Sequence, residues 1–419
     1  MTAPYIAKFE FAARSCALLC ALFLPISTSL TDLLFTLALI LSVCAGRFRE
    51  RIWKLSENPI AWACVLFYSL FIFGLFYTHA HAHEAIHQLI KFNWLIGIVL
   101  IMPLFNDVIW SHRLLNIFLT SACIILLLSY GKYFFIKHDI YAPTKTVLIF
   151  KDYMVQNLVF ALSGLIFLYR YLRYKIFNRL YGVLSALFLF NVIFLGAART
   201  IILLLPLLLA YLFIQLYKWK GIAWALLLFT TLCITIVFVP TTLHHRFKNI
   251  TTNINHYKQG NYQTSVGFRI YTELSGFKLW LQKPVLGYGT GGIQAAYATL
   301  PPNEIKQTGP IDNASNEYLN FALQFGTMGL LMLFVWLGLL WYYSGKLPYS
   351  LQIPMRLLLI AVIISNVANS WLTDTTPSHL IALLTAGFLA NIKMPLLSKK
   401  FTEVRLESTA PIPRSPDSV

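Results

Sequence analysis

Uncharged apolar runs recur along most of the 419-residue chain and are separated by short polar connectors. The runs are centred near residues 18, 37, 68, 98, 122, 162, 188, 208, 230, 331, 363 and 384. Each is about 20 residues long, the length of a helix that crosses a bilayer. The pattern predicts an all-α, polytopic integral membrane protein with about 12 transmembrane helices. The first two runs are the weakest of these spans and could form one hairpin broken near residues 25–29.

One long polar interval, from about Pro240 to Asn320, interrupts this alternation. The sequence therefore predicts four parts. They are transmembrane helices 1–9 over residues 1–240, a long loop with the candidate chemical motifs and short helices over 241–315, transmembrane helices 10–12 over 316–393, and a polar, proline-bearing tail over 394–419. The tail has no apolar period and is expected to be disordered and cytoplasmic.

Lysine and arginine in the connectors indicate how the chain is oriented. If the N-terminus lies in the cytoplasm, most of the basic connectors, such as 47–54 and 170–179, also face the cytoplasm, as the positive-inside rule expects. The connector after the fifth run is an exception, because its lysines fall on the predicted outer side. In a bacterium this orientation places the long loop, and any active site on it, at the periplasmic face of the inner membrane.

The composition supports a membrane protein and argues against other classes. Hydrophobic residues make up 58% of the chain and charged residues 12%, which is too apolar for an ordinary soluble domain. The net charge of +17 would suggest nucleic acid as the partner of a soluble protein. Here many of the cations lie in connectors where orientation requires them, so no nucleic-acid partner is expected. The six cysteines lie in apolar runs without metal-ligand spacing.

Residues 267–283 of the long loop carry apolar side chains at roughly helical spacing, which predicts a helix lying against the membrane surface. Arg269 and Glu273 are one turn apart on this helix, and Pro284 should end it. The following string PVLGYGTGG contains Gly287 and Gly289. Glycines lack a Cβ and therefore allow a sharp turn or a close backbone approach to a ligand. No strand–helix–strand unit surrounds them, which excludes a dinucleotide fold.

Two histidines on the outer side, His83 and His87, are one helical turn apart in the string HAHAHEAIHQLIKFNW. A zinc pair is conceivable, but the sequence places no third ligand beside them. An interfacial amphipathic segment is the better interpretation, and the two histidines are left out of the candidate site.

Two arginines are the strongest candidates for chemistry. Arg199 ends an apolar run, where a guanidinium is costly unless it is solvated or paired. Snorkelling to the interface is the plain explanation, and binding of an anion is the functional one. A pair formed by Arg199 and Arg269 would offer planar donors to phosphate oxygens and neutralise a pyrophosphate leaving group. The chemistry indicated is glycosyl transfer from a lipid pyrophosphate.

At these residues the chain resembles the O-antigen ligases and the related O-antigen polymerases, which are membrane glycosyltransferases of the GT-C type. The family pattern has two arginines, matched by Arg199 in GAARTIILL and Arg269 in SVGFRIYTE, and then a proline- and glycine-rich turn, matched by KPVLGYGTGG. It closes with a His-Asn pair, nine residues and Gly-x-x-Gly, to which Asn316, Gly326 and Gly329 conform. The motif-level resemblance covers about residues 188–340.

Ser315 occupies the position of the family histidine, which the resemblance identifies as the proposed base for the acceptor hydroxyl. Serine has no comparable basicity. Asp312, Glu317, Asp374 and His379 are predicted on or near the outer face and could supply the missing group. Alternatively, the reaction relies on leaving-group stabilisation without a strong base, or the activity has been lost.

The resemblance implies an O-antigen ligase that transfers glycan from undecaprenyl pyrophosphate to lipid A-core in lipopolysaccharide biosynthesis. The implied catalytic residues are Arg199, Arg269, Ser315, Asp312 and Glu317. The implied substrate-binding residues are Arg199, Arg269, Gly287, Gly289, Asn316 and Tyr318. No metal and no cofactor are implied, because arginines replace the divalent cation. The implied partners are the undecaprenyl pyrophosphate-linked glycan donor, the lipid A-core acceptor and membrane lipids.

Other functions are weighed against this one. An O-antigen polymerase or a protein O-oligosaccharyltransferase would use the same lipid-linked donor with a different acceptor, and sequence motifs barely separate the three. A transporter usually shows two matched halves with polar residues deep in several spans, whereas here the polar features gather in one interval. A purely structural membrane protein would not need this combination of arginines, glycine turn and closing pattern.

Overall fold

The computed structural model describes residues 3–46, 55–135, 148–150, 153–196, 198–238, 254–255, 257–260, 262–301 and 308–393. Within these ranges every regular element is helical. The longer helices are α1 (Ala3–Phe23), α2 (Thr28–Cys44), α4 (Pro59–Gly74), α5 (Ala82–Lys91), α6 (Trp94–Ile101), α7 (Val108–Phe135), α8 (Tyr153–Arg173), α9 (Asn178–Phe190), α10 (Arg199–Tyr217), α11 (Trp219–Phe238), α13 (Ser265–Gln282), α16 (Glu317–Ser344), α17 (Tyr349–Ser365) and α18 (Thr375–Leu389). Short helical pieces are η1 (Leu75–Tyr77), η2 (Met102–Leu104), η3 (Asn191–Leu195) and α14 (Ile293–Tyr297).

A helix lies at each of the twelve predicted centres, so the all-helical prediction is confirmed for the described residues. Six stretches among them are long and apolar enough to cross a membrane: Pro59–Tyr77, Ala82–Leu104, Val108–Phe135, Tyr153–Arg173, Asn178–Leu195 and Glu317–Ser344. Further apolar helices, such as α17 and α18, are shorter. These findings support a multi-pass membrane protein, while the number of spans and the side that each loop faces stay predictions.

Capping side chains mark where several helices begin. Ser27 caps α2, Asn58 caps α4 with Pro59 directly after it, and Thr264 caps α13, each accepting a hydrogen bond from a backbone N–H of the first turn. The first two apolar runs therefore form two helices, α1 and α2, joined by a short turn. The helix predicted over residues 267–283 is present as α13, and it ends at Gln282, two residues before Pro284. Its position against the membrane surface stays a prediction.

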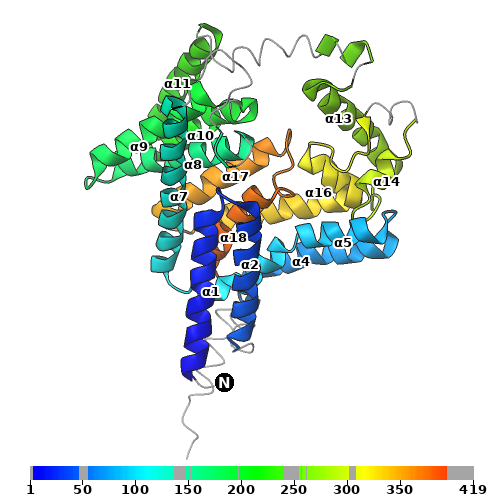
Figure 1. Ribbon diagram of the computed structural model, residues 1–419, viewed down its shortest axis with the longest axis horizontal. Coiled ribbons are helices and arrows are strands. Elements are labelled where there is room, and N and C mark those ends of the chain that lie inside the picture. The colour runs from blue at the N-terminus through cyan, green and yellow to red at the C-terminus, as the bar shows by residue number, and fades with distance from the viewer. Residues whose placement is uncertain are drawn as a thin grey trace, which may run out of the picture.

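The helices pack as neighbours around one large apolar core. The pairs α1–α2, α8–α9 and α10–α11 are adjacent both in sequence and in space, and α16 lies against α4, α13 and α17. In Figure 1, α13 and α14 lie beside α16, at the opposite end of the molecule from α9 and α11. The described part of the long polar interval is therefore attached to the first half of α16.

A second, smaller apolar cluster holds this attachment together. Tyr271 and Leu279 of α13, Tyr297 of α14 and Leu319 and Leu323 of α16 belong to it and are buried. Burying such side chains contributes roughly 1.5–3 kcal/mol each relative to leaving them exposed. The loop thus has its own hydrophobic support, which fixes α13 and its arginine relative to the start of α16.

Candidate functional site

Arg269 lies in the first half of α13 and reaches across to another part of the chain. Its Nη1 donates a hydrogen bond of 2.7 Å to the carbonyl oxygen of Ala368. Ala368 belongs to the bend 366–374, the residues that join α17 to α18. The guanidinium is partly buried and is held in one direction by this contact. An arginine has five N–H donors, so a single bond to a carbonyl leaves donors for an anion.

The turn of α13 that carries Arg269 is also fixed to the segment before α16. The Thr272 hydroxyl lies 3.0 Å from the carbonyl oxygen of Arg269 and 3.2 Å from that of Ala314. The carbonyl oxygen of Thr272 in turn accepts from the Tyr297 hydroxyl at 2.5 Å. Since Ala314 precedes Ser315, these contacts bring the arginine and the position of the family histidine into one neighbourhood.

Asn313 organises the segment that leads into α16. Its Oδ1 accepts from the Ser315 backbone N–H at 2.7 Å, from Asn320 Nδ2 at 3.1 Å and from the Ser370 hydroxyl at 2.7 Å. Asn320 Oδ1 accepts from the Ala314 N–H at 2.9 Å. Side chains from the 313–320 region and from the bend 366–374 thus form one hydrogen-bond network, which limits the movement of the segment around Ser315.

Ser315 itself has φ of 58°, in the left-handed region that residues other than glycine seldom adopt. Its side chain is partly exposed. Such backbone conformations persist only where the surrounding contacts enforce them, and they gather at functional sites. Among residues with a side chain, asparagine, aspartate and histidine enter this region most readily. The conformation at position 315 therefore suits the family histidine as well as the serine that this chain carries.

Glu317, the first residue of α16, is fully buried, although a carboxylate at the start of a helix is ordinarily solvated. Its oxygens accept from the Thr373 hydroxyl at 2.9 and 3.2 Å. Its backbone N–H donates to the carbonyl oxygens of Asn366 at 2.9 Å and Asn369 at 3.2 Å. Both backbone and side chain of Glu317 thus connect the start of α16 to the bend 366–374, the same bend that holds Arg269.

Glu273 lies one helical turn after Arg269 on α13. Burial raises the pKa of its carboxyl group, and the positive charge of Arg269 acts in the opposite direction. The carboxylate is therefore partly desolvated, and it lies close enough to the guanidinium to influence the charge that an anionic ligand would meet.

The glycine turn packs against a break in α16. Gly326 has φ of 61° and ψ of −152°, which interrupts the helix. The Tyr288 N–H donates to the Leu323 carbonyl oxygen at 2.7 Å, and the Thr327 N–H donates to the Pro284 carbonyl oxygen at 2.7 Å. In an unbroken helix the Thr327 N–H would bind the Leu323 oxygen. Backbone groups of the turn thus replace the hydrogen bond that Leu323 and Thr327 would form within the helix. The KPVLGYGTGG string and the Gly-x-x-Gly string therefore form one structural unit.

Gly287 and Gly289 are packed within this unit. A Cβ at Gly287 would overlap the carbonyl oxygen of Leu323, and one at Gly289 would overlap the backbone of Thr78. Both glycines also have positive φ, 67° and 83°. The two glycines thus allow a close approach to the protein's own backbone. Direct contact of either glycine with a substrate stays a prediction.

The remaining predicted residues lie around the start of α16. The Asn316 side-chain oxygen caps this helix by accepting from the Leu319 N–H at 3.1 Å. The Tyr318 hydroxyl donates to the Ile363 carbonyl oxygen at 2.6 Å. The Asp312 side chain is exposed. Arg199 is the first residue of α10, and its side chain lies outside the described residues, so its predicted meeting with Arg269 stays a prediction.

Sequence reasoning did not find the contribution of the bend 366–374. Ser370, Thr373 and the backbone of Ala368 connect Arg269, Asn313 and Glu317, yet none of the three was singled out from the sequence. The available signal is compositional: the polar string NVANSWLTDTTPS interrupts two apolar runs, and polar residues between spans often line a site. No pattern within that string indicates which partner each side chain contacts.

Residues 183–334 match the family model described as O-Antigen ligase. This match confirms the resemblance to the O-antigen ligase and polymerase superfamily. The matched segment runs from α9 to the middle of α16 and contains Arg199, Arg269, the glycine turn and Asn316, while the bend 366–374 lies beyond it. The match supports a ligase- or polymerase-type function in O-antigen processing. A search of curated protein sequences found no match to this chain.

Proposed function

We propose that this protein is an O-antigen ligase of the GT-C type, which transfers a glycan from undecaprenyl pyrophosphate to lipid A-core at the periplasmic face of the inner membrane. The observation that carries the proposal is the position of Arg269. Its guanidinium donates a hydrogen bond to the bend 366–374. The same bend is hydrogen-bonded to Glu317 and to the network around Ser315. A donor for phosphate oxygens therefore lies in the same neighbourhood as the segment assigned to the acceptor.

Transfer of the glycan requires the bond between its anomeric carbon and the pyrophosphate oxygen to break. The electron pair of that bond stays with the leaving pyrophosphate, whose negative charge increases in the transition state. A fixed guanidinium binds two phosphate oxygens at once and gains strength as that charge develops. Arg269 is held by Ala368 before the substrate arrives, so little reorganisation accompanies the reaction. In this scheme Arg199 is the second pyrophosphate ligand, and no metal ion is needed.

The acceptor approaches from the side of α16. In the proposed arrangement the side chains of Asn316 and Tyr318 line that side. Each contacts the acceptor with the part of its surface that is not engaged in its hydrogen bond to Leu319 or Ile363. Gly287 and Gly289 shape the loop by allowing it to pack against the break in α16. Asp312 and Ser315 lie on the segment that faces the acceptor, and Glu317 holds this segment to the bend.

The experiment that tests the proposal identifies the product made by the purified protein in liposomes. The protein would receive polyprenyl pyrophosphate-linked glycan together with lipid A-core, with a second donor molecule alone, or with a serine- and threonine-containing peptide. Mass spectrometry should find glycan joined to lipid A-core. A lengthened donor chain without ligated product would instead show a polymerase, and a glycosylated peptide would show a protein O-oligosaccharyltransferase.

A further inference from the structure

A pocket lies between α2, α5 and the start of α18, outside the segment that matches the family model. Its volume is about 340 Å³. Its lining residues are Asp32, Phe35, Thr36, His87, Ile90, Lys91, Asn93, Thr373, Thr375, Ser378 and His379. None of these residues falls within 183–334, so the family pattern does not assign the pocket.

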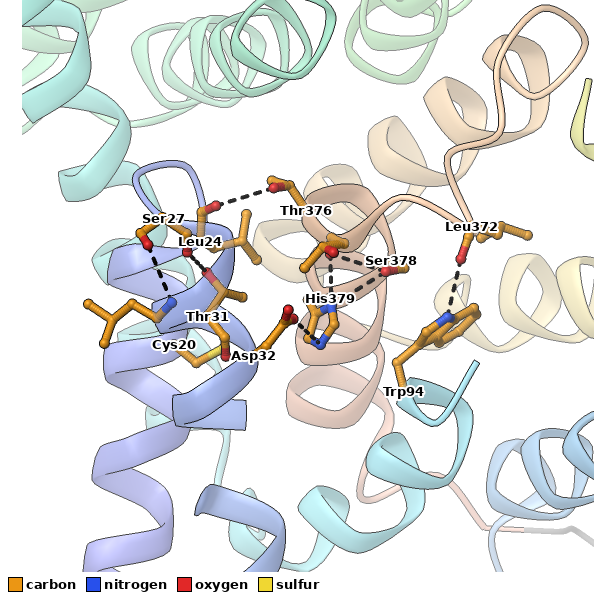
Figure 2. Close-up of polar contacts among 12 residues, drawn as sticks. Cys20, Leu24, Ser27, Thr31, Asp32, Trp94, Leu372, Thr376, Ser378 and His379 are labelled. Carbon is orange, nitrogen blue, oxygen red and sulfur yellow. Dashed lines mark hydrogen bonds and ion pairs between the residues drawn. The ribbon is translucent and has the colours of Figure 1, made fainter. Parts of the chain in front are cut away.

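His379 is the best-defined group in the pocket. Figure 2 shows its ring between Asp32 of α2 and the first turn of α18. Its Nδ1 is 2.7 Å from the carbonyl oxygen of Thr375, and a carbonyl can only accept, so Nδ1 carries a proton. The Phe35 ring packs edge-on at 4.5 Å between centroids and restricts rotation of the imidazole. In the neutral ring, Nε2 is then the nitrogen that accepts a proton.

Asp32 stands next to that nitrogen. Its Oδ1 is 3.5 Å from His379 Nε2, which is an ion-pair distance but longer than a normal hydrogen bond. The histidine side chain is 9% exposed and that of Asp32 is 53% exposed. The carboxylate is close enough to stabilise an imidazolium that forms when Nε2 takes up a proton.

The pocket adjoins the candidate site through a single residue. Thr373 lines the pocket, and its hydroxyl donates to the carboxylate of Glu317. The bend on which Thr373 lies is also fixed from the other side, because Trp94 Nε1 donates to the Leu372 carbonyl oxygen at 3.2 Å (Figure 2). Thr373 therefore belongs to both the pocket and the candidate site. The bend that carries it is hydrogen-bonded to Glu317 on one side and to Trp94 on the other.

The lining suits a sugar. Hydroxyl groups of Thr36, Thr375 and Ser378 and the amide of Asn93 offer both donors and acceptors. Lys91 adds a cation for an acidic or phosphorylated substituent. An apolar lipid chain would offer these groups no hydrogen bonds.

We propose that this pocket receives the sugar of the acceptor and that His379 takes the proton from its attacking hydroxyl. The inference rests on the proposed transfer reaction. The acceptor O–H bond breaks and its proton moves to His379 Nε2, while the oxygen forms the new bond to the anomeric carbon of the glycan. The bond from that carbon to the pyrophosphate breaks, and its electron pair leaves with the pyrophosphate. His379 thus supplies the basicity that Ser315 lacks.

Charged and titratable groups of two neighbouring helices lie beside His379. Asp32 comes from α2, His87 and Lys91 come from α5, and Asp374 is the residue before α18. Asp32 is nearest, and its negative charge attracts an imidazolium, whereas the positive charge of Lys91 repels it.

The test is steady-state kinetics of transfer to lipid A-core by His379→Gln and Asp32→Asn in liposomes. Glutamine retains a donor for the Thr375 carbonyl oxygen but has no basic nitrogen. We expect His379→Gln to lower kcat by about 10²–10⁴-fold. His87→Gln should chiefly raise KM, and His112→Gln, a histidine of α7 near Ser350, should match the wild type.

Asp32→Asn keeps the inference testable if His379→Gln does not fold. Without the carboxylate, the imidazolium that forms during transfer is less stabilised, so kcat should fall while binding of the donor stays unchanged. Unchanged kcat in folded His379→Gln or in folded Asp32→Asn would overturn the role of His379. If the wild type forms no transfer product at all, the proposed function fails first. Binding of the donor by each variant shows which of the two has failed.

Discussion

Glu273 and Arg269 show how two charges one helical turn apart on α13 depend on each other. The arginine is held by a carbonyl of the bend 366–374, and the carboxyl group one turn later is partly desolvated. Their spacing in the sequence indicated a pair, but not the direction in which each side chain points. That direction comes from Ala368, a residue 99 positions away from Arg269, which no local pattern could have indicated.

Replacement of Glu273 by glutamine should change stability in a pH-dependent way. Because burial raises the pKa of this carboxyl group, the folded protein holds its proton more tightly than the unfolded chain does. The favourable contribution is present below the unfolded pKa of about 4.3 and is lost as the pH rises through the folded pKa. Glu273→Gln should therefore unfold at a slightly higher temperature than the wild type at pH 7 and at the same temperature near pH 4.

Thermal unfolding in detergent across this pH range measures the difference. A variant less stable than the wild type at pH 7 would mean that the attraction to Arg269 outweighs desolvation. The effect should be small, since the group is half-exposed and solvent screens its charge.

The element that the sequence described least well is α16. The apolar run centred near residue 331 predicted its presence, and in the structure Asn316 caps its start. Its break at Gly326 was not predicted, because glycine inside an apolar run is compatible with an unbroken membrane helix. The break becomes understandable only when the turn 284–289 is in place, since its backbone groups replace the helical partners of Leu323 and Thr327.

Two glycines of the same helix should respond to alanine in opposite ways. A Cβ at Gly326 would overlap the Val285 carbonyl oxygen, and the positive φ disfavours any side chain, so Gly326→Ala should cost roughly 2–5 kcal/mol. Gly338 is helical, and no atom lies within 4 Å of the place that an added methyl group would take, so Gly338→Ala should stabilise by about 0.4–1 kcal/mol. Reversible unfolding of both variants in mixed micelles would compare them. Equal effects at the two positions would contradict the interlocked turn.

At the scale of the whole molecule, periodicity and charge predicted the class and the positions of the helices. The sequence also marked Arg269 and the 312–318 segment, and the structure brings both to the bend 366–374. It did not predict that bend, because contacts between distant loops depend on how the helices pack and not on local pattern. The pocket beside His379 was missed for the same reason: its walls come from α2, α5 and α18, which are far apart along the chain.

The central claim is that Arg269 binds the pyrophosphate of the donor as the glycan is transferred. Its most direct measurement is the single-turnover rate of transfer in liposomes by Arg269→Ala, with Lys278→Ala as the control. Lys278 is an exposed cation on the same helix, so the pair separates a specific contact from a general loss of positive charge. Arg269→Ala should slow transfer by about 10²–10³-fold, while Lys278→Ala should stay close to the wild type. A folded Arg269→Ala protein that transfers glycan at the wild-type rate would contradict the account.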